Sequence, residues 1–386
     1  MPANNIILIS LVTAVLLGGC VEPYTPEIKE SQDLLIVEGL LTDQPGYQYV
    51  YISRTSPFND PRQYPVSDCQ VRVVDESDNS FAFHEKEDGT YELWIDDGEL
   101  TRDVSYKLII TLPNSAGTYE SHWETLGEPC APIDSLYYKL ETVQTADPSQ
   151  PERGIQFYID VNTDNYKAQN YRWLLTETWE YRSVHYIQYY WDGEELYKMT
   201  DPKIYHTCWK TDRVTGIFAS TTRLSDEKRI MGFPLNYVSD ETNRLMHRYS
   251  LLVQQYTLSD DAYDYWDKMG KQLQESGGLY DTQPVQLNGN IKNINDPEEI
   301  VLGYFNVSST SEKRVFTGDL SDLNPPGFNC ELTVVRSTRR MPYYWELPIF
   351  MKSLSIMESG PPYGIGRGIC FDCRTLGGTI EKPDFW

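Results

Sequence analysis

Short runs in which apolar and polar residues alternate fill the chain from residue 34 to residue 126. The turn signals Asp88-Gly89 and Asp97-Gly98 separate some of these runs. Alternation with a period of two predicts strands that bury one face, and strands at this density are typical of a β-sandwich. The sequence therefore predicts an N-terminal β-sandwich over 34–126. Its expected strands are LLIVEGLL, YQYVYIS, CQVRVVD, NSFAFHE, TYELWI, YKLIITL and TYESHWE.

A second β-rich domain is predicted over 135–386, after the boundary sequence TLGEPCAPID at 125–134. Its expected strands include IQFYIDV, KIYHTCW and RYSLLVQQYTL. The run YRWLLTETWEYRSVHYIQYYW is long enough for two strands or for one bent strand. Further on, EIVLGYFNVSS and EKRVFTG predict a returning hairpin. The tail from residue 320 is rich in Pro, Gly and Cys, and we expect it to be irregular.

One helix is predicted over about 259–276, where the sequence reads SDDAYDYWDKMGKQLQES. Ser259 is a suitable N-cap, acidic residues follow in the first turn, and two glycines come directly after the segment. Tyr265, Met269 and Leu273 are spaced four residues apart, which predicts one apolar face. The expected fold class is mainly β, with a β-sandwich followed by a second β-rich domain that carries one inserted α-helix.

The first residues predict a lipoprotein signal peptide over 1–19. The apolar run at 6–17 has twelve residues, fewer than the roughly 20 that a membrane span needs, but a typical length for a signal peptide. LLGGC at 16–20 has the form of a lipobox, so we expect cleavage before Cys20 and lipidation of its thiol, which anchors a protein to a membrane. The preceding MPANN lacks the basic residues of a typical signal peptide. Residues 20–33 predict a tether.

The chain is strongly acidic, with 57 Asp and Glu residues, 33 Lys and Arg residues and a formal charge of −24. The first nineteen residues carry no charged side chain, so the mature chain keeps this charge. A field of this sign repels phosphate backbones, which argues against nucleic-acid binding. We interpret the acidity as that of a solvated surface.

Seven cysteines are present. If Cys20 is lipidated, six remain, and an even number in an exported protein predicts disulfides, with fifteen possible connectivities. Cys69 and Cys130 are one candidate pair, as a staple on the first sandwich. We expect the other four to lie close together and to pin the C-terminal tail. These four are Cys208, Cys330, Cys370 and Cys373.

The sequence contains no GxSxG, HExxH or GxxxxGK[ST] motif of the common catalytic and nucleotide-binding sites. His206, Cys208, Cys370 and Cys373 have the chemistry of zinc ligands, but an oxidising, exported location favours disulfides between these thiols. The run DVNTDN at 160–165 has the alternating oxygens of a calcium loop but lacks the glycine and the glutamate that follow in such loops. We expect no metal, no cofactor and no enzymatic activity.

Aromatic residues make up 13% of the chain, and two clusters of them are candidate binding surfaces. The first cluster lies in a strand-like run, where ordinary sheet packing is the competing interpretation. The second lies between two prolines in the irregular tail. The candidates are Tyr189, Tyr190 and Trp191 in the first cluster and Tyr343, Tyr344 and Trp345 in the second.

Four stretches carry a family resemblance: CVEPYTPE, LLIVEGLLTDQPG, GGLYDTQPVQLNGNIKNINDPEEIVLGYFNVSS and the ending CFDCRTLGGTIEKPDFW. In them the chain resembles a family of Bacteroidota outer-membrane lipoproteins of unknown function (DUF4249-like). The resemblance implies a lipoprotein that is often encoded beside a TonB-dependent transporter and whose N-terminal sandwich is similar to the carboxypeptidase-regulatory or prealbumin type of module. The expected fold of this sandwich is immunoglobulin-like or prealbumin-like. It transfers no activity and no binding residue to this sequence.

These features predict a lipid-anchored, surface-exposed outer-membrane protein. We expect a non-enzymatic accessory of a TonB-dependent transporter, which captures substrate or caps the transporter. A structural or assembly factor of the cell envelope without a small ligand is the alternative. A hydrolase with an unfamiliar site, for example around His185 or His206, would need reactive groups that converge in one cleft. A concave pocket with polar groups favours ligand capture, whereas a flat apolar patch favours protein contact.

Overall fold

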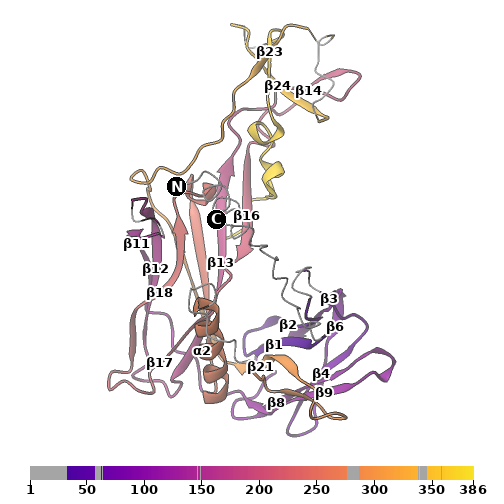
Figure 1. Ribbon diagram of the computed structural model, residues 1–386, viewed down its shortest axis with the longest axis vertical. Coiled ribbons are helices and arrows are strands. Elements are labelled where there is room, and N and C mark those ends of the chain that lie inside the picture. The colour runs from indigo at the N-terminus through magenta and orange to yellow at the C-terminus, as the bar shows by residue number, and fades with distance from the viewer. Residues whose placement is uncertain are drawn as a thin grey trace, which may run out of the picture.

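The chain is arranged in three parts along one long axis, as a computed structural model shows (Figure 1). Two β-sandwiches lie next to one another at one end, and a small sheet forms a tip at the other end. The described residues are mainly β with one α-helix, as predicted. These residues are 33–56, 62, 64–145, 147, 149–275, 287–337, 339, 346–357 and 359–386.

The first sandwich encloses a core between two sheets, and residues such as Val37, Val50, Val73 and Leu108 fill it. All seven runs predicted as strands over 34–126 form strands, and two of them divide into a pair. One sheet has the order β21-β1-β2-β7-β6, with β3 beside β2, and the other has the order β20-β9-β8-β4-β5, with β10 beside β8. The strands of the first sheet are β1 (Leu35–Thr42), β2 (Gly46–Arg54), β3 (Tyr64–Pro65), β6 (His84–Glu87), β7 (Thr90–Ile95) and β21 (Val301–Ser308). The second sheet contains β4 (Gln70–Asp75), β5 (Ser80–Ala82), β8 (Ser105–Thr111), β9 (Thr118–Ser121), β10 (Glu124–Thr125) and β20 (Ile291–Asn293), and a short 3₁₀ turn η1 (Pro113–Ser115) follows β8.

Two strands of the first sandwich come from far along the chain. β21 pairs in parallel with β1, and β20 pairs with β9. The predicted hairpin of EIVLGYFNVSS and EKRVFTG is therefore wrong, because β21 completes the first sandwich while β22 (Thr310–Phe316) pairs with β19 (Tyr249–Thr257) in the second. Gly303 permits the parallel pairing: its φ is +96°, and a Cβ there would lie 2.0 Å from the Val37 carbonyl oxygen. Residues 291–308 thus interrupt the stretch predicted as a second domain.

The second sandwich buries a large aromatic core between its two sheets, which includes Phe157, Trp173 and Tyr249. On β13, Trp173 and Leu175 point into this core, whereas Leu174 and Thr176 lie on the opposite face. One sheet has the order β11-β12-β18; the other has the order β16-β13-β19-β22, with β17 beside β13. The strands are β11 (Ser135–Val143), β12 (Glu152–Asn162), β13 (Asn170–Arg182), β16 (Thr207–Arg213), β17 (Phe218–Thr221) and β18 (Arg229–Ser239), and η2 (Asn243–Leu245) precedes β19.

Helix α2 (Asp260–Glu275) lies between the two sandwiches (Figure 1), within the predicted range. The Ser259 hydroxyl accepts a hydrogen bond of 3.2 Å from the Ala262 N–H, which confirms the predicted N-cap. Trp266 belongs to the buried face, together with the expected Tyr265. The apolar face ends at Met269, however, and Leu273 is 58% exposed. In the described part of the chain, no helix combines the length and the apolar character that a membrane crossing needs.

The tip is a small sheet with the order β15-β14-β24-β25-β23. Three of its strands lie in the tail that we expected to be irregular, so that expectation was only partly right. Its core is small and includes Tyr189, Met351 and Ile365. The elements are β14 (Tyr189–Trp191), β15 (Leu196–Lys198), β23 (Thr333–Val335), β24 (Ile349–Ser353) and β25 (Tyr363–Ile365), followed by the 3₁₀ turns η4 (Gly368–Cys370) and η5 (Cys373–Leu376).

Candidate functional site

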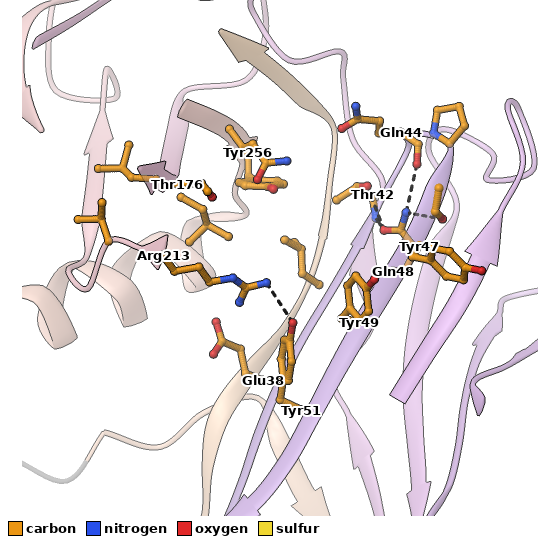
Figure 2. A pocket seen from close by; sticks show the side chains of 17 residues that line it. Glu38, Thr42, Gln44, Tyr47, Gln48, Tyr49, Tyr51, Thr176, Arg213 and Tyr256 are labelled. Carbon is orange, nitrogen blue, oxygen red and sulfur yellow. Dashed lines mark hydrogen bonds between the residues drawn. The ribbon is translucent and has the colours of Figure 1, made fainter. Parts of the chain in front are cut away.

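A cleft of about 360 Å³ lies between the two sandwiches (Figure 2). Residues of β1 and β2 form one wall, and residues of β13, β19 and the end of β16 form the other. Both walls are the faces of these sheets that point away from the sandwich cores. The volume is within the range of small-molecule sites, and the lining combines aromatic rings, aliphatic side chains and a few polar groups.

Three tyrosines of β2 form what we call the tyrosine row: Tyr47, Tyr49 and Tyr51. They share one face because side chains alternate along GYQYVYISR, whereas Val50 and Ile52 point into the core. Adjacent ring centres in the row are 6.4 Å and 6.2 Å apart. The row therefore offers a continuous aromatic surface to the cleft, and such surfaces contribute large contact area at low entropic cost.

Two side chains of neighbouring strands extend the tyrosine row. The Trp94 ring meets the Tyr47 ring edge to face, with centres 5.0 Å apart. The Lys86 ammonium lies 5.2 Å from the centre of the Tyr49 ring and forms an ion pair of 3.0 Å with Glu92. Trp94 is 53% exposed and Tyr47 is 54% exposed. Half of each of these rings is thus available for contact.

Arg213 reaches across the cleft from the second sandwich (Figure 2). Its Nη2 donates a hydrogen bond of 3.0 Å to the Tyr51 hydroxyl, and its guanidinium carbon lies 5.5 Å from the Tyr51 ring centre. Gln254 and Thr176 add an amide and a hydroxyl to the same wall. The cleft therefore has one charged side chain that links its two walls.

A buried guanidinium lies beside the cleft, at the junction of β13, α2 and β1. Arg172 is 8% exposed, and its guanidinium carbon lies 3.4 Å from the Trp266 ring centre. Its Nη2 is 3.6 Å from a carboxylate oxygen of Glu38, which lines the cleft. Burial lowers the pKa of Arg172, and the negative charge of Glu38 opposes this effect. The Glu38 carboxylate is thus already partnered within the protein.

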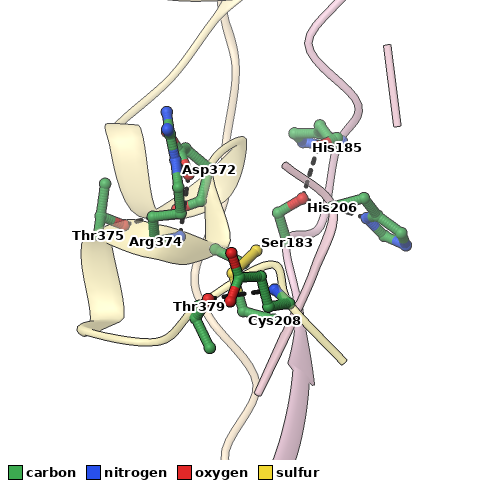
Figure 3. The surroundings of a disulfide bond; sticks show 10 residues. Ser183, His185, His206, Cys208, Asp372, Arg374, Thr375 and Thr379 are labelled. Atoms are coloured by element: carbon green, nitrogen blue, oxygen red, sulfur yellow. Dashed lines mark hydrogen bonds and ion pairs between the residues drawn. A yellow bond between two sulfur atoms is a disulfide. The ribbon is translucent and has the colours of Figure 1, made fainter. Parts of the chain in front are cut away.

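Two disulfides hold the C-terminal tail, and Figure 3 shows the surroundings of the one formed by Cys208. Cys208 of β16 pairs with Cys373, and Cys330 pairs with Cys370; the Cα atoms are 5.6 Å and 5.5 Å apart, respectively. The prediction that these four cysteines lie close together and pin the tail is confirmed. The backbone groups of Trp209 and Thr379 hydrogen-bond to each other and reinforce the attachment. The zinc site considered for these thiols would need them unpaired.

The predicted staple between Cys69 and Cys130 is wrong, because both cysteines are free. Cys69 lies against the core of the first sandwich, whereas Cys130 lies in the core of the second. Gln255 Nε2 donates to the Cys130 sulfur at 3.3 Å. Burial raises the pKa of both thiols, which keeps them protonated and unreactive.

The histidines considered for a hydrolase site, His185 and His206, lie near the disulfide of Cys208 (Figure 3). The Ser183 hydroxyl is 3.1 Å from His206 Nδ1 and donates to the His185 carbonyl oxygen at 3.0 Å. Ser183 is buried, and burial lowers the pKa of His206. His185 Nε2 lies 3.2 Å from the Cys330 carbonyl oxygen. These contacts fasten the tip to the second sandwich.

The first predicted aromatic cluster lies in β14, apart from the cleft. Tyr189 is buried and meets Tyr363 edge to face, and Trp191 packs on the tip core. Tyr190 stacks on Tyr197 with ring centres 5.0 Å apart. Much of this cluster is therefore sheet packing, and a binding role remains a prediction. The second cluster, Tyr343, Tyr344 and Trp345, lies outside the described residues.

Exposed apolar side chains gather at the tip. The loop at 354–357 follows β24 and leads toward β25, and we call it the tip loop. In this loop Ile356 is fully exposed and Met357 is 86% exposed. Val334 on the edge strand β23 and Leu347 are more than half exposed. Exposed apolar side chains that form one contiguous patch are typical of surfaces that contact other molecules.

The tyrosine row and Arg213 were not predicted from the sequence. YQYVYIS was identified as a strand, but its three tyrosines were not assigned to one outward face, although the period of two places them there. Arg213 carries no local signal because its partner, Tyr51, is 162 residues away. Among the described residues, no group of three or more His, Cys, Asp or Glu side chains is placed to hold a metal ion.

A protein-family model described as a domain of unknown function (DUF4249) matches residues 21–314. The chain belongs to this family. The matched range includes both sandwiches up to β22 and every residue that lines the cleft. The DUF4249 chain has no match among curated proteins. Membership therefore agrees with the family resemblance. Because the function of the family is unknown, a function for this chain has to be inferred from the geometry of the site.

Proposed function

We propose that this protein is a non-enzymatic lipoprotein of the outer membrane that captures a small ligand for a TonB-dependent transporter. The cleft between the sandwiches is the observation that carries the proposal. It is concave, has the volume of a ligand site and combines the tyrosine row with Arg213, Gln254 and Thr176. Its lining offers contact area and hydrogen bonds, which is what reversible capture requires.

The proposed location rests on the N-terminal sequence. LLGGC at 16–20 has the form of a lipobox, and lipidation of Cys20 would hold the protein on the membrane. The tether at 20–33 leads directly into β1 of the first sandwich. A tether of this length reaches about 45 Å when extended. The cleft would therefore stay close to the membrane and to a transporter in it.

The tip supports the proposed contact with a transporter. It lies at the far end of the long axis from the first sandwich (Figure 1) and exposes the tip loop. Its two disulfides limit the motion of the segments that carry these side chains. A stable apolar surface away from the ligand site would allow the protein to bind a partner and a ligand at the same time.

Affinity purification of the native protein from outer membranes in mild detergent, followed by mass spectrometry, tests the proposal. We expect a TonB-dependent barrel in about equal amount. A Cys20→Ala variant is the matched control, because it keeps every described residue and should leave the membrane fraction. Repeated recovery of the lipidated protein without a barrel would overturn the transporter assignment.

The exposed tip loop also favours a second candidate, a structural or assembly factor of the envelope without a small ligand. Such a factor would need the tip but not the cleft. Double substitution of Tyr49 and Arg213 by alanine separates the two functions. If this double variant reaches the membrane at the normal level but no longer functions in cells, the result supports ligand capture. If it functions normally, the result supports the structural role.

A further inference from the structure

Among the described residues, Arg213 and Glu38 are the two charged residues that line the cleft. Figure 2 shows their side chains pointing into the same part of it. Glu38 is already paired with the buried Arg172, which lies behind the wall. These two arginines and one carboxylate carry a net formal charge of +1, inside a protein whose formal charge is −24.

Arg213 has hydrogen-bonding capacity to spare. A guanidinium has five N–H donors, and the Tyr51 hydroxyl accepts one of them. In the described ranges, no carboxylate oxygen lies within 4.0 Å of the Arg213 guanidinium nitrogens, so Arg213 forms no ion pair with them. The contact with Tyr51 holds the guanidinium over the tyrosine row, so its remaining donors face a ligand that lies on these rings.

We propose that the cleft binds a carboxylate group attached to a flat or extended apolar body, with Arg213 holding the carboxylate and the tyrosine row contacting the body. This inference rests on the proposed capture function and names its ligand class. A ligand that fills the cleft removes water from the Arg213 guanidinium, and a neutral ligand would leave that charge unpaired at a cost. A carboxylate matches the fork of N–H donors and removes the cost.

The body of the ligand can come from two sources. Two residues of an extended peptide span about 6.6 Å, close to the ring spacings of 6.4 Å and 6.2 Å in the tyrosine row. Alternate side chains of such a peptide would therefore meet successive rings, and its C-terminus would supply the carboxylate. A small aromatic acid would instead stack on one ring. Both sources share the chemistry that Arg213 selects.

Isothermal titration of the soluble chain with two matched probe pairs tests the inference. One pair is N-acetyl-Ala-Ala-Phe with a free or an amidated C-terminus, and the other is 2-naphthoate and 2-naphthamide. We expect the acid of at least one pair to bind about tenfold more tightly than its amide, which corresponds to about 1.4 kcal/mol. The pair that shows this preference identifies the source of the body.

Arg213→Gln should abolish the preference for the acid while retaining the weaker binding of the amide. Arg229→Gln is the matched control, since Arg229 is a surface residue paired with Asp164 away from the cleft, and it should leave both affinities unchanged. Equal binding of acid and amide would overturn the carboxylate inference and leave ligand capture standing. Binding of neither member of either pair would overturn the inference, and the purification experiment would then decide the proposed function by itself.

Discussion

The Arg172 guanidinium carbon lies 3.4 Å from the centre of the Trp266 ring. Arg172 belongs to β13 of the second sandwich, Trp266 to α2, and Glu38, the ion-pair partner of Arg172, to β1 of the first sandwich. One side chain therefore links three elements that are far apart in the sequence. The width of the cleft depends on this junction, because β1 and β13 supply its opposite walls.

Arg172→Ala should lower the free energy of unfolding by about 2–4 kcal/mol, since a desolvated cation–π contact and a buried ion-pair partner are both lost. We place the value in the lower half of this range, because the Glu38 side chain is 50% exposed and solvent screens the pair. Urea unfolding measures the change. Arg229→Ala, in an exposed ion pair, should change stability by less than about 0.5 kcal/mol. Equal effects of the two variants on the free energy of unfolding would contradict the stabilising role of Arg172 at this junction.

The thiol count offers a direct check of the cysteine assignments. A soluble chain that starts at residue 21, denatured without reductant, should titrate two thiols, Cys69 and Cys130, because the other four cysteines are in disulfides. After reduction the count should rise to six, as the sequence requires. A count of zero before reduction would restore the pairing of Cys69 with Cys130. A count of six would mean that the tail is not pinned.

Much of the first sandwich could be predicted from the sequence because apolar and polar residues alternate along most of its strands and turn signals such as Asp88-Gly89 separate some of them. β18 was missed for a physical reason: Pro234 cannot donate to a sheet ladder, Gly232 has a positive φ of 58°, and the pairing with β12 shifts in register. The parallel pairing of β21 with β1 was also missed, since a contact between residues 266 positions apart leaves no local pattern.

The candidate site, too, could be predicted only in part from the sequence. The tyrosine row follows from a period of two, but its role depends on which sheet faces it, and that is a tertiary relationship. Cys208 and the three cysteines of the tail were predicted to lie close together, whereas their pairing was not predicted, because spacing alone does not bring Cys208 beside Cys373.

Glu124 should make stability depend on pH. Its carboxylate is buried and accepts hydrogen bonds from the Tyr304 hydroxyl at 2.9 Å and from Asn290 Nδ2 at 3.2 Å. Burial raises the pKa of Glu124 above its ordinary value of 4.5, and these hydrogen bonds partly offset the rise. The folded state thus favours the protonated form. The stability that the protonated Glu124 side chain contributes is fully present below about pH 4.5, and it is lost as the pH rises through the higher pKa of the folded state.

Glu124→Gln removes this titration. Relative to the parent chain, the variant should therefore gain stability as the pH rises from 4 toward 7, and urea unfolding across this range measures the difference. Glu128→Gln is the control, because Glu128 lies beside the same region but is paired with Lys167 at the surface. Parallel stability profiles of Glu124→Gln and the parent would contradict the assignment.

The tip loop should be required for partner binding and not for folding. The described residues within 183–206 and 327–376, which form the tip and its base, include seven acidic and seven basic residues, so their formal charge is zero while the whole chain carries −24. The tip is thus the part of the protein where a partner meets exposed apolar side chains without a strong electrostatic barrier. This local neutrality makes the tip, rather than the acidic sandwiches, the expected contact surface.

Ile356→Asp combined with Met357→Asp should reduce recovery of the transporter at least about tenfold, because each apolar side chain contributes about 1.5–3 kcal/mol when buried and each carboxylate opposes desolvation. Leu224→Asp is the matched control, since Leu224 is 97% exposed on the second sandwich, far along the chain from the tip loop. All three side chains are exposed, so neither protein should change in melting temperature. Equal recovery with the tip and control variants would show that the partner binds elsewhere, and the sheet faces beside the cleft would then be the surface to alter.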